Sequence, residues 1–160
     1  MKNMKKTIEK NIASFCNASP LPKGRAGGES SRGYRNNNPL NIRHSHDKWK
    51  GMSPKQTDPV FVQFQTMAYG YRAAFVLLRT YRQKYGCNTI RKIVKRWAPP
   101  KENNTDRYIE NVSRWTGIEA DKMLAGQDAN AWIRIVAAMS RMENGVEARM
   151  EEVAEGQRMA

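Results

Sequence analysis

The sequence predicts an α+β fold, with a mainly helical body and a small antiparallel β-flap near the start of the domain. Residues 36–64 combine turn-forming residues with the alternating run "VFVQF", which is typical of short strands. After residue 65, apolar residues recur at helical spacing between capping residues and glycines. Strands and helices that are segregated along a chain, rather than alternating, favour an α+β arrangement.

The expected flap begins at a turn. Asn38-Pro39 is a turn-starting dipeptide, and Gly51 lies in a second connection. The candidates for paired strands are Ile42, Trp49 and the run from Val60 to Phe64.

Four helices are expected after the flap. Each begins at a side chain that can cap the first turn and ends at a glycine or proline. The pairs of start and stop residues are Thr66 and Gly86, Thr89 and Pro99, Thr105 and Gly117, and Asp128 and Gly145.

A chain of 160 residues suits one domain. Residues 1–31 are rich in Ser, Pro and Gly, which predicts a flexible basic arm. The folded domain is expected over residues 32–145. Residues 146–160 are predicted to be a weakly helical tail that frays.

The net charge of +13 indicates a polyanionic partner. Residues 118–160 are slightly acidic, so the excess charge lies in the earlier part of the chain. Nucleic acid and the carboxylate-rich bacterial cell wall both fit, but no base-reading module is recognisable, which disfavours nucleic acid. No apolar run approaches the roughly 18–20 residues that span a bilayer, and the N-terminus lacks the apolar segment of a signal peptide.

Glu143, in "RMENG", is a candidate general acid. It falls in the last turn of an apolar helix, where the helix dipole and partial burial both raise the pKa of a carboxyl group. A raised pKa is what a general acid needs at neutral pH. The alternative is an ordinary solvated glutamate.

A second group of residues suits sugar binding. The amides of Asn37, Asn38 and Asn41 can donate to and accept from acetamido and hydroxyl groups. Trp49 and Phe64 can stack on sugar rings. The alternatives are that the asparagines build turns and that the aromatic residues pack in the core.

Metal and cofactor sites are not predicted. His44 and His46, in the run "HSHD" that ends at Asp47, resemble part of a metal site, but a third protein ligand is not evident. The sequence has no phosphate-binding glycine loop. Cys16 and Cys87 are expected to be unpaired thiols.

Several segments together resemble a known group of proteins. "NNNPLNIR", followed by the Trp-x-Gly, Phe-containing and "GYRAAFVLL" segments, is similar to wall-degrading glucosaminidases. "RGYRNNNPLNIR", "RWAPPKENNTDRYIENV" and "RMENG" resemble phage-type virion structural proteins with a lysozyme-like domain. The resemblance covers residues 32–145.

This resemblance implies a lysozyme-like fold that cleaves peptidoglycan, with Glu143 as the acid. "NNTDRYIENV" is similar to a segment of lytic transglycosylases, which places Tyr108 beside the catalytic centre and Asn103 near the substrate. The implied partners are glycan strands and other virion or secretion components. The implied location is the virion, or the cell wall or periplasm after export.

One departure leaves the assignment of the acid open. In the lytic families the catalytic glutamate precedes the asparagine-rich segment, whereas Glu143 follows it. Glu29 has the usual order but stands in a glycine-rich arm, so Glu143 is preferred. Asp58 opposite Glu143 would favour hydrolysis over transglycosylation, although an Asp-Pro turn is its simpler role.

The leading hypothesis is therefore cleavage of the β-1,4 bond between N-acetylmuramic acid and N-acetylglucosamine. Two alternatives remain. One is a non-catalytic virion structural or wall-binding protein of the same fold, and the other is a nucleic-acid-binding protein.

Overall fold

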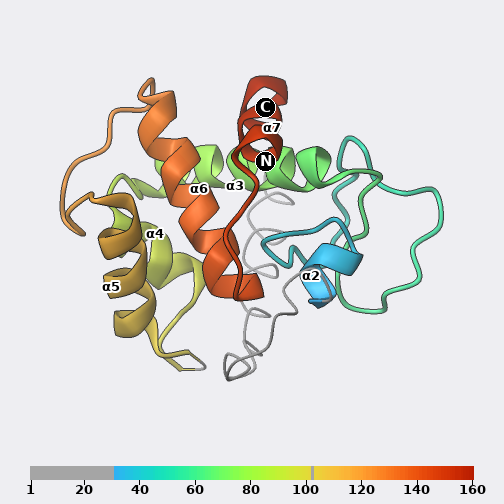
Figure 1. Ribbon diagram of the computed structural model, residues 1–160, viewed down its shortest axis with the longest axis horizontal. Helices are drawn as coiled ribbons and strands as arrows, with labels where there is room; N and C mark the ends of the chain where they lie inside the picture. The colour runs from blue at the N-terminus through green and yellow to red at the C-terminus, as the bar shows by residue number, and fades with distance from the viewer. Residues whose placement is uncertain (1–30, 102) are drawn as a thin grey trace.

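The computed structural model describes residues 31–101 and 103–160, and these residues form a helical domain (Figure 1). The predicted arm, Cys16 and Glu29 lie outside the described residues, apart from Ser31. The helices are α2 (Arg32–Arg35), α3 (Met67–Tyr85), α4 (Ile90–Trp97), α5 (Thr105–Thr116), α6 (Ala129–Asn144) and α7 (Met150–Met159).

The predicted helix starts are confirmed for three of the four helices. Thr66, Thr89 and Asp128 each accept a hydrogen bond from the backbone N–H three residues later. The prediction for Thr105 is wrong by one residue, because Asn104 caps α5. Asparagine is among the most favourable N-cap residues, and the hydroxyl of Thr105 instead donates to the carbonyl of Ala98 at 2.5 Å.

Helix α3 is the longest element, and α7 and α6 pack on it. In Figure 1 it runs along the long axis of the molecule while α6 crosses in front of it. Helices α4 and α5 pack on each other and α5 packs on α6. Tyr71 and Leu78 of α3 and Ile135 and Met139 of α6 are almost completely buried and belong to one hydrophobic core.

The C-terminal segment, expected to be a fraying tail, forms α7 and packs closely against α3. Val153 is fully buried. Gly156 allows the two backbones to approach, because a Cβ atom there would lie 2.6 Å from Cβ of Tyr71 and 2.8 Å from the backbone nitrogen of Arg72. The helix lacks a side-chain N-cap, so we attribute its stability to this packing.

The α+β prediction, including its lysozyme-like antiparallel β-flap, is wrong. Within the described residues, the segment between α2 and α3 forms an irregular loop with two isolated antiparallel bridges, Arg43 to Phe61 and Met52 to Phe64, and no sheet. The described part of the chain is therefore helical.

The physical reason is that side-chain amides replace ladder hydrogen bonds in this loop. Nδ2 of Asn38 donates to the carbonyls of Ile42 and Val62, both at 2.8 Å. Oε1 of Gln56 accepts from the backbone nitrogen of Gln63, and Nε2 of Gln56 donates to the carbonyl of Gln63. Side chains that bond locally to the backbone compete with regular pairing.

No helix in the described ranges is both long and apolar enough to cross a membrane.

Candidate active site

Glu143 lies in the last turn of α6, one residue before the helix ends at Asn144. Gly145 follows in a left-handed conformation with φ of 74° and donates its backbone N–H to the carbonyl of Arg141. This glycine cap ends the helix directly after the carboxyl-bearing residue. The sequence-based placement of Glu143 at a helix C-terminus is therefore confirmed.

Two predicted site residues donate hydrogen bonds to the carboxylate of Glu143. The hydroxyl of Tyr108, on α5, donates to Oε1 at 3.3 Å. Nδ2 of Asn41, in the loop before α3, donates to Oε2 at 3.4 Å. Three segments that are distant in the sequence thus meet at one carboxyl group.

Burial raises the pKa of Glu143 to about 7. Hydrogen bonds to Asn41, Tyr108 and Trp97 act in the opposite direction but do not cancel this effect. The residue as a whole is only partly buried, so it retains contact with solvent. Near neutral pH the group is present in both its protonated and its ionised form, as acid–base catalysis requires.

Tyr108 is held in its neutral form. Burial is the largest cause that raises its pKa well above the usual value, and the charge of Glu143 adds to it. Because the phenol stays protonated, it acts as a hydrogen-bond donor to the carboxylate. Its side chain is 5% exposed, so its position is fixed by packing.

Asn41 can serve both protonation states of Glu143. Its backbone φ is 52°, which is uncommon for a residue other than glycine. Its Nδ2 donates to Glu143, while its buried Oδ1 has no hydrogen-bond partner among the described residues. A side-chain amide carries both a donor and an acceptor. Its N–H group can donate to a carboxylate, and its oxygen can accept from the O–H of a carboxylic acid.

Asn144 attaches the asparagine-rich loop to the end of α6. Its Nδ2 donates to the carbonyl of Pro39 at 2.7 Å and to that of Ser140 at 2.9 Å. Its Oδ1 accepts from the hydroxyl of Ser31 at 2.7 Å. With 6% of its surface exposed, Asn144 is a buried connector that holds Asn41 close to Glu143.

Two predicted sugar-binding residues belong to the core instead. Asn38 is fully buried and its amide bonds to the backbone of Ile42 and Val62. Phe64 is 2% exposed. Neither side chain is accessible to a ligand, so the structural alternative holds for both.

The remaining predicted residues lie away from the carboxyl contacts. Nδ2 of Asn37 donates to the carbonyls of Phe64 and Gln65, and Nδ2 of Asn103 donates to that of Pro99. Trp49 is partly buried and lines a separate pocket of about 350 Å³. None of the contacts described for these three side chains reaches Glu143.

Asp58 does not face Glu143 as a second carboxylate. Its oxygens accept from the guanidinium of Arg32 at 2.7 Å, from the amide of Asn36 and from the backbone nitrogens of Val60 and Phe61. The bond to Arg32 is the main cause that lowers the pKa of Asp58. Asp58 is therefore the acceptor that organises its own turn.

The described residues contain no group of three or more His, Cys, Asp or Glu side chains placed to hold a metal ion. Nε2 of His44 is 2.8 Å from the carbonyl oxygen of Asp58, which gives it a role in the same turn. Cys87 is a buried free thiol.

Sequence reasoning missed the connecting roles of Asn144 and Ser31 and the effect of Trp97 on the pKa of Glu143. The sequence predicts the helix stop at Gly145 and assigns no further role to the preceding Asn144. Its position beside a candidate catalytic residue was the available signal, because a buried amide there can join two segments. Nothing in the local sequence indicated that Ser31 or Trp97 would contribute.

Comparison with known proteins places the chain among bacteriophage proteins. The chain is 43% identical over 120 residues to Protein P5 of Pseudoalteromonas phage PM2, and the match covers 73% of each chain. The chain belongs to the Protein P5 family. This confirms the phage part of the resemblance seen in the sequence. No protein-family model matches the chain. The resemblance of this chain to wall-degrading enzymes stays a prediction.

Proposed function

We propose that this chain cleaves the glycan strands of peptidoglycan, with Glu143 as the general acid. The observation that carries the proposal is the carboxyl group of Glu143, whose pKa is about 7 and whose two oxygens meet Asn41 and Tyr108. A positioned carboxylic acid that is protonated near neutral pH can protonate the oxygen of a glycosidic bond.

The first step transfers the proton of Glu143 to the glycosidic oxygen between N-acetylmuramic acid and N-acetylglucosamine. The bond from C1 to that oxygen then breaks, and its electron pair stays with the leaving oxygen. Positive charge develops on C1 and the ring oxygen, as in other glycosidases. Glu143 is left as a carboxylate, to which Tyr108 and Asn41 donate hydrogen bonds.

In the second step, we expect a hydroxyl group of the substrate itself, and not a second carboxylate of the protein, to attack C1. Asp58, the alternative considered from the sequence, is occupied by Arg32 and its own turn. The C6 hydroxyl of the muramic acid attacks C1 and loses its proton to the Glu143 carboxylate, which forms an anhydro sugar. A single glutamate then serves first as acid and then as base, which is the lytic transglycosylase route.

The sequence and the family support a cell-wall substrate. The net charge of +13 favours a polyanionic partner, and the relative from phage PM2 places the chain among proteins of viruses that must pass a bacterial envelope. We propose that the protein is associated with the virion and acts on the host wall, with other virion components as partners.

A second candidate is a non-catalytic virion or wall-binding protein. One observation favours it: the carboxylate of Glu143 bonds to Asn41 and Tyr108, so it joins α6 to α5 and to the loop before α3. A buried polar network of this kind can be retained because it fixes the arrangement of the elements.

Product analysis separates the two candidates. Purified sacculi are incubated with the full chain, and the soluble fraction is examined by mass spectrometry. The proposal predicts disaccharide fragments that end in anhydromuramic acid. Fragments with a reducing muramic acid would indicate hydrolysis instead. Retention of the protein on sacculi without soluble fragments would support the non-catalytic candidate.

A further inference from the structure

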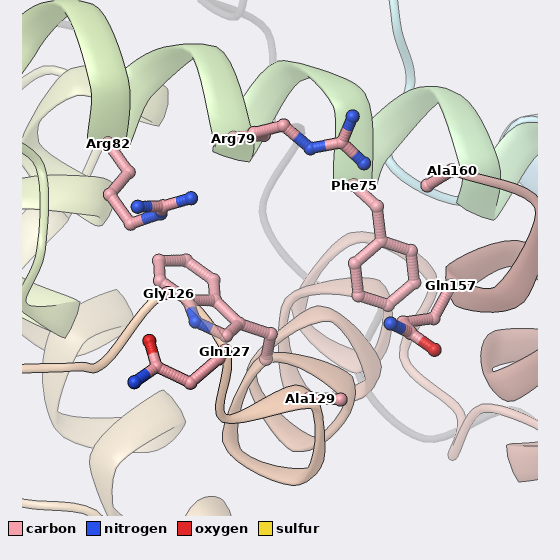
Figure 2. Close-up of a pocket in the computed structure, with 9 residues that line it drawn as sticks. Phe75, Arg79, Arg82, Gly126, Gln127, Ala129, Gln157 and Ala160 are labelled. Atoms are coloured by element: carbon pink, nitrogen blue, oxygen red, sulfur yellow. The ribbon is translucent and has the colours of Figure 1, made fainter.

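A second pocket lies at the opposite end of α6 from Glu143. It has a volume of about 170 Å³, and α3, α6, α7 and the loop before α6 line it (Figure 2). Trp132, one of its residues, precedes Glu143 by roughly 16 Å along the helix, at about 1.5 Å per residue. The pocket is therefore separate from the proposed glycan-cleaving site.

The side chains that line the pocket include two arginines and no aspartate or glutamate. Arg79 and Arg82 come from successive turns of α3 and share one wall (Figure 2). Neither takes part in an ion pair or hydrogen bond among the described residues. Two guanidinium groups three residues apart on one helix repel each other, so a bound anion would stabilise them.

Gly126, in the loop before α6, leaves room for the guanidinium group of Arg82. A Cβ atom on Gly126 would lie 2.5 Å from Cζ and Nη1 of Arg82, so the absence of a side chain is what permits this approach. The indole N–H of Trp132 donates to the carbonyl of Ala125 at 3.0 Å and fixes the loop to α6. This bond ties the residue before Gly126 to the start of α6.

The other lining residues suit a small ligand with a polar and an apolar part. Gln127 and Gln157 also line the pocket, and in Figure 2 they lie on the side away from the arginines of α3. Both glutamine amides can donate. Phe75 and Trp132 are each 7% exposed and supply apolar contacts. The volume is below the about 300–1,000 Å³ of sites for drug-sized ligands, so the pocket fits a compact head group and not a glycan strand.

We propose that this pocket binds a phosphate group. Phosphate offers more acceptor oxygens and a higher charge than a carboxylate, so it can bond to both guanidinium forks and to a glutamine amide at once. Arginine forks are well suited to phosphate because their paired N–H groups match two of its oxygens. The phosphate belongs either to a soluble compound or to a phospholipid head group.

The test is an NMR titration of the full chain with inorganic phosphate at constant ionic strength, followed through the side-chain signals of Trp132, Arg79 and Arg82. The variant R79Q/R82Q removes both guanidinium groups, and K92Q/K95Q is the control, because it removes the same charge from the exposed face of α4. We expect saturable shifts of Trp132 in the wild type and in the control, and affinity at least about tenfold weaker in R79Q/R82Q. Gly126→Val keeps the charge but occupies the space of the Arg82 guanidinium, so it is also expected to weaken binding.

Equal phosphate affinity in R79Q/R82Q and the wild type, no saturable shift in the wild type, or equal shifts with acetate would overturn the proposal. Sedimentation with phosphatidylglycerol vesicles then identifies the source of the phosphate. Vesicle binding that falls in R79Q/R82Q but not in K92Q/K95Q supports a lipid head group. Vesicle binding that is the same in all variants, together with loss of inorganic phosphate binding in R79Q/R82Q, supports a soluble phosphate compound.

Discussion

Asn41 and Glu143 stand 102 residues apart in the sequence, yet Nδ2 of Asn41 donates to Oε2 of Glu143 at 3.4 Å. This contact joins the asparagine-rich loop to the end of α6. It places a polar side chain of the loop directly on the proposed catalytic acid.

The first prediction concerns pH and stability. Burial raises the pKa of Glu143 to about 7 from 4.5, so the folded chain holds this proton more tightly than the unfolded chain does. The resulting stability is complete below about pH 4.5 and is lost as the pH rises through about 7. We expect E143Q to raise the free energy of unfolding by roughly 1–3 kcal/mol near pH 8 and to change it little near pH 4. Urea unfolding at both pH values measures this, with the exposed Glu147→Gln as control; a loss of stability in E143Q near pH 8 would contradict it.

The second prediction concerns the donor from α5. Tyr108→Phe removes the hydroxyl that bonds to Oε1 of Glu143. Because this bond stabilises the ionised form, its loss is expected to raise the pKa of Glu143 above about 7. Carboxyl ¹³C chemical shifts followed against pH report the value. Tyr85→Phe is the matched control, since its buried hydroxyl has no partner among the described residues. An unchanged or lower pKa in Tyr108→Phe would show that the hydrogen bond has no such effect.

The third prediction concerns the connector. Asn144→Ala removes the side-chain bonds to Ser31, Pro39 and Ser140. Buried partners are left unsatisfied, so we expect a loss of about 2–4 kcal/mol in the free energy of unfolding. The exposed Asn130→Ala, at the start of the same helix, is expected to stay within about 1 kcal/mol of the wild type. Equal losses in the two variants would refute the connector role.

The fourth prediction concerns the contact between the asparagine-rich loop and Gly70 of α3. A Cβ atom on Gly70 would lie 2.1 Å from the carbonyl oxygen of Asn37 and 2.6 Å from Cδ of Pro39. Gly70→Ala therefore requires the loop to move, and we expect it to cost about 2 kcal/mol or more in thermal or urea unfolding. Gly86→Ala is the comparison, because φ there is 63° but no atom lies within 4 Å of the new Cβ, so only about 1 kcal/mol of backbone strain is expected. A Gly70→Ala protein as stable as the wild type would mean that this contact is not tight.

The sequence predicts α3, α4, α5 and α6 because their signals are local, but it misses α2 and the packed helix α7. Caps at Thr66, Thr89 and Asp128 and the glycine ends act within one turn, and Glu143 could be placed at a helix end on the same basis. Alternation in "VFVQF" suggested a sheet, but pairing depends on which groups compete for the backbone. Gln56 and Gln63 supply that competition, and their partners could not be known without the folded loop.

The sequence predicts the candidate site only in part, because the chemistry of single residues is local but their meeting in space is not. Polar residues that meet in space, such as Asn41, Tyr108 and Glu143, could be proposed one by one from their chemistry. Their convergence depends on long-range packing, as does the burial that removes Asn38 and Phe64 from the site. An alternating pattern or an asparagine run does not distinguish a buried side chain from an exposed one.

The most direct test of the catalytic role is the release of soluble glycan fragments from purified sacculi by wild type, Glu143→Gln and Glu147→Gln at neutral pH. Glutamine keeps the shape of the side chain but cannot donate the proton, whereas Glu147 is an exposed residue paired with Arg141 at 3.4 Å. The proposed mechanism predicts that Glu143→Gln lowers the rate by at least about 100-fold and that Glu147→Gln stays within about twofold of wild type. Full activity in a correctly folded Glu143→Gln protein would contradict the assignment of Glu143 as the acid.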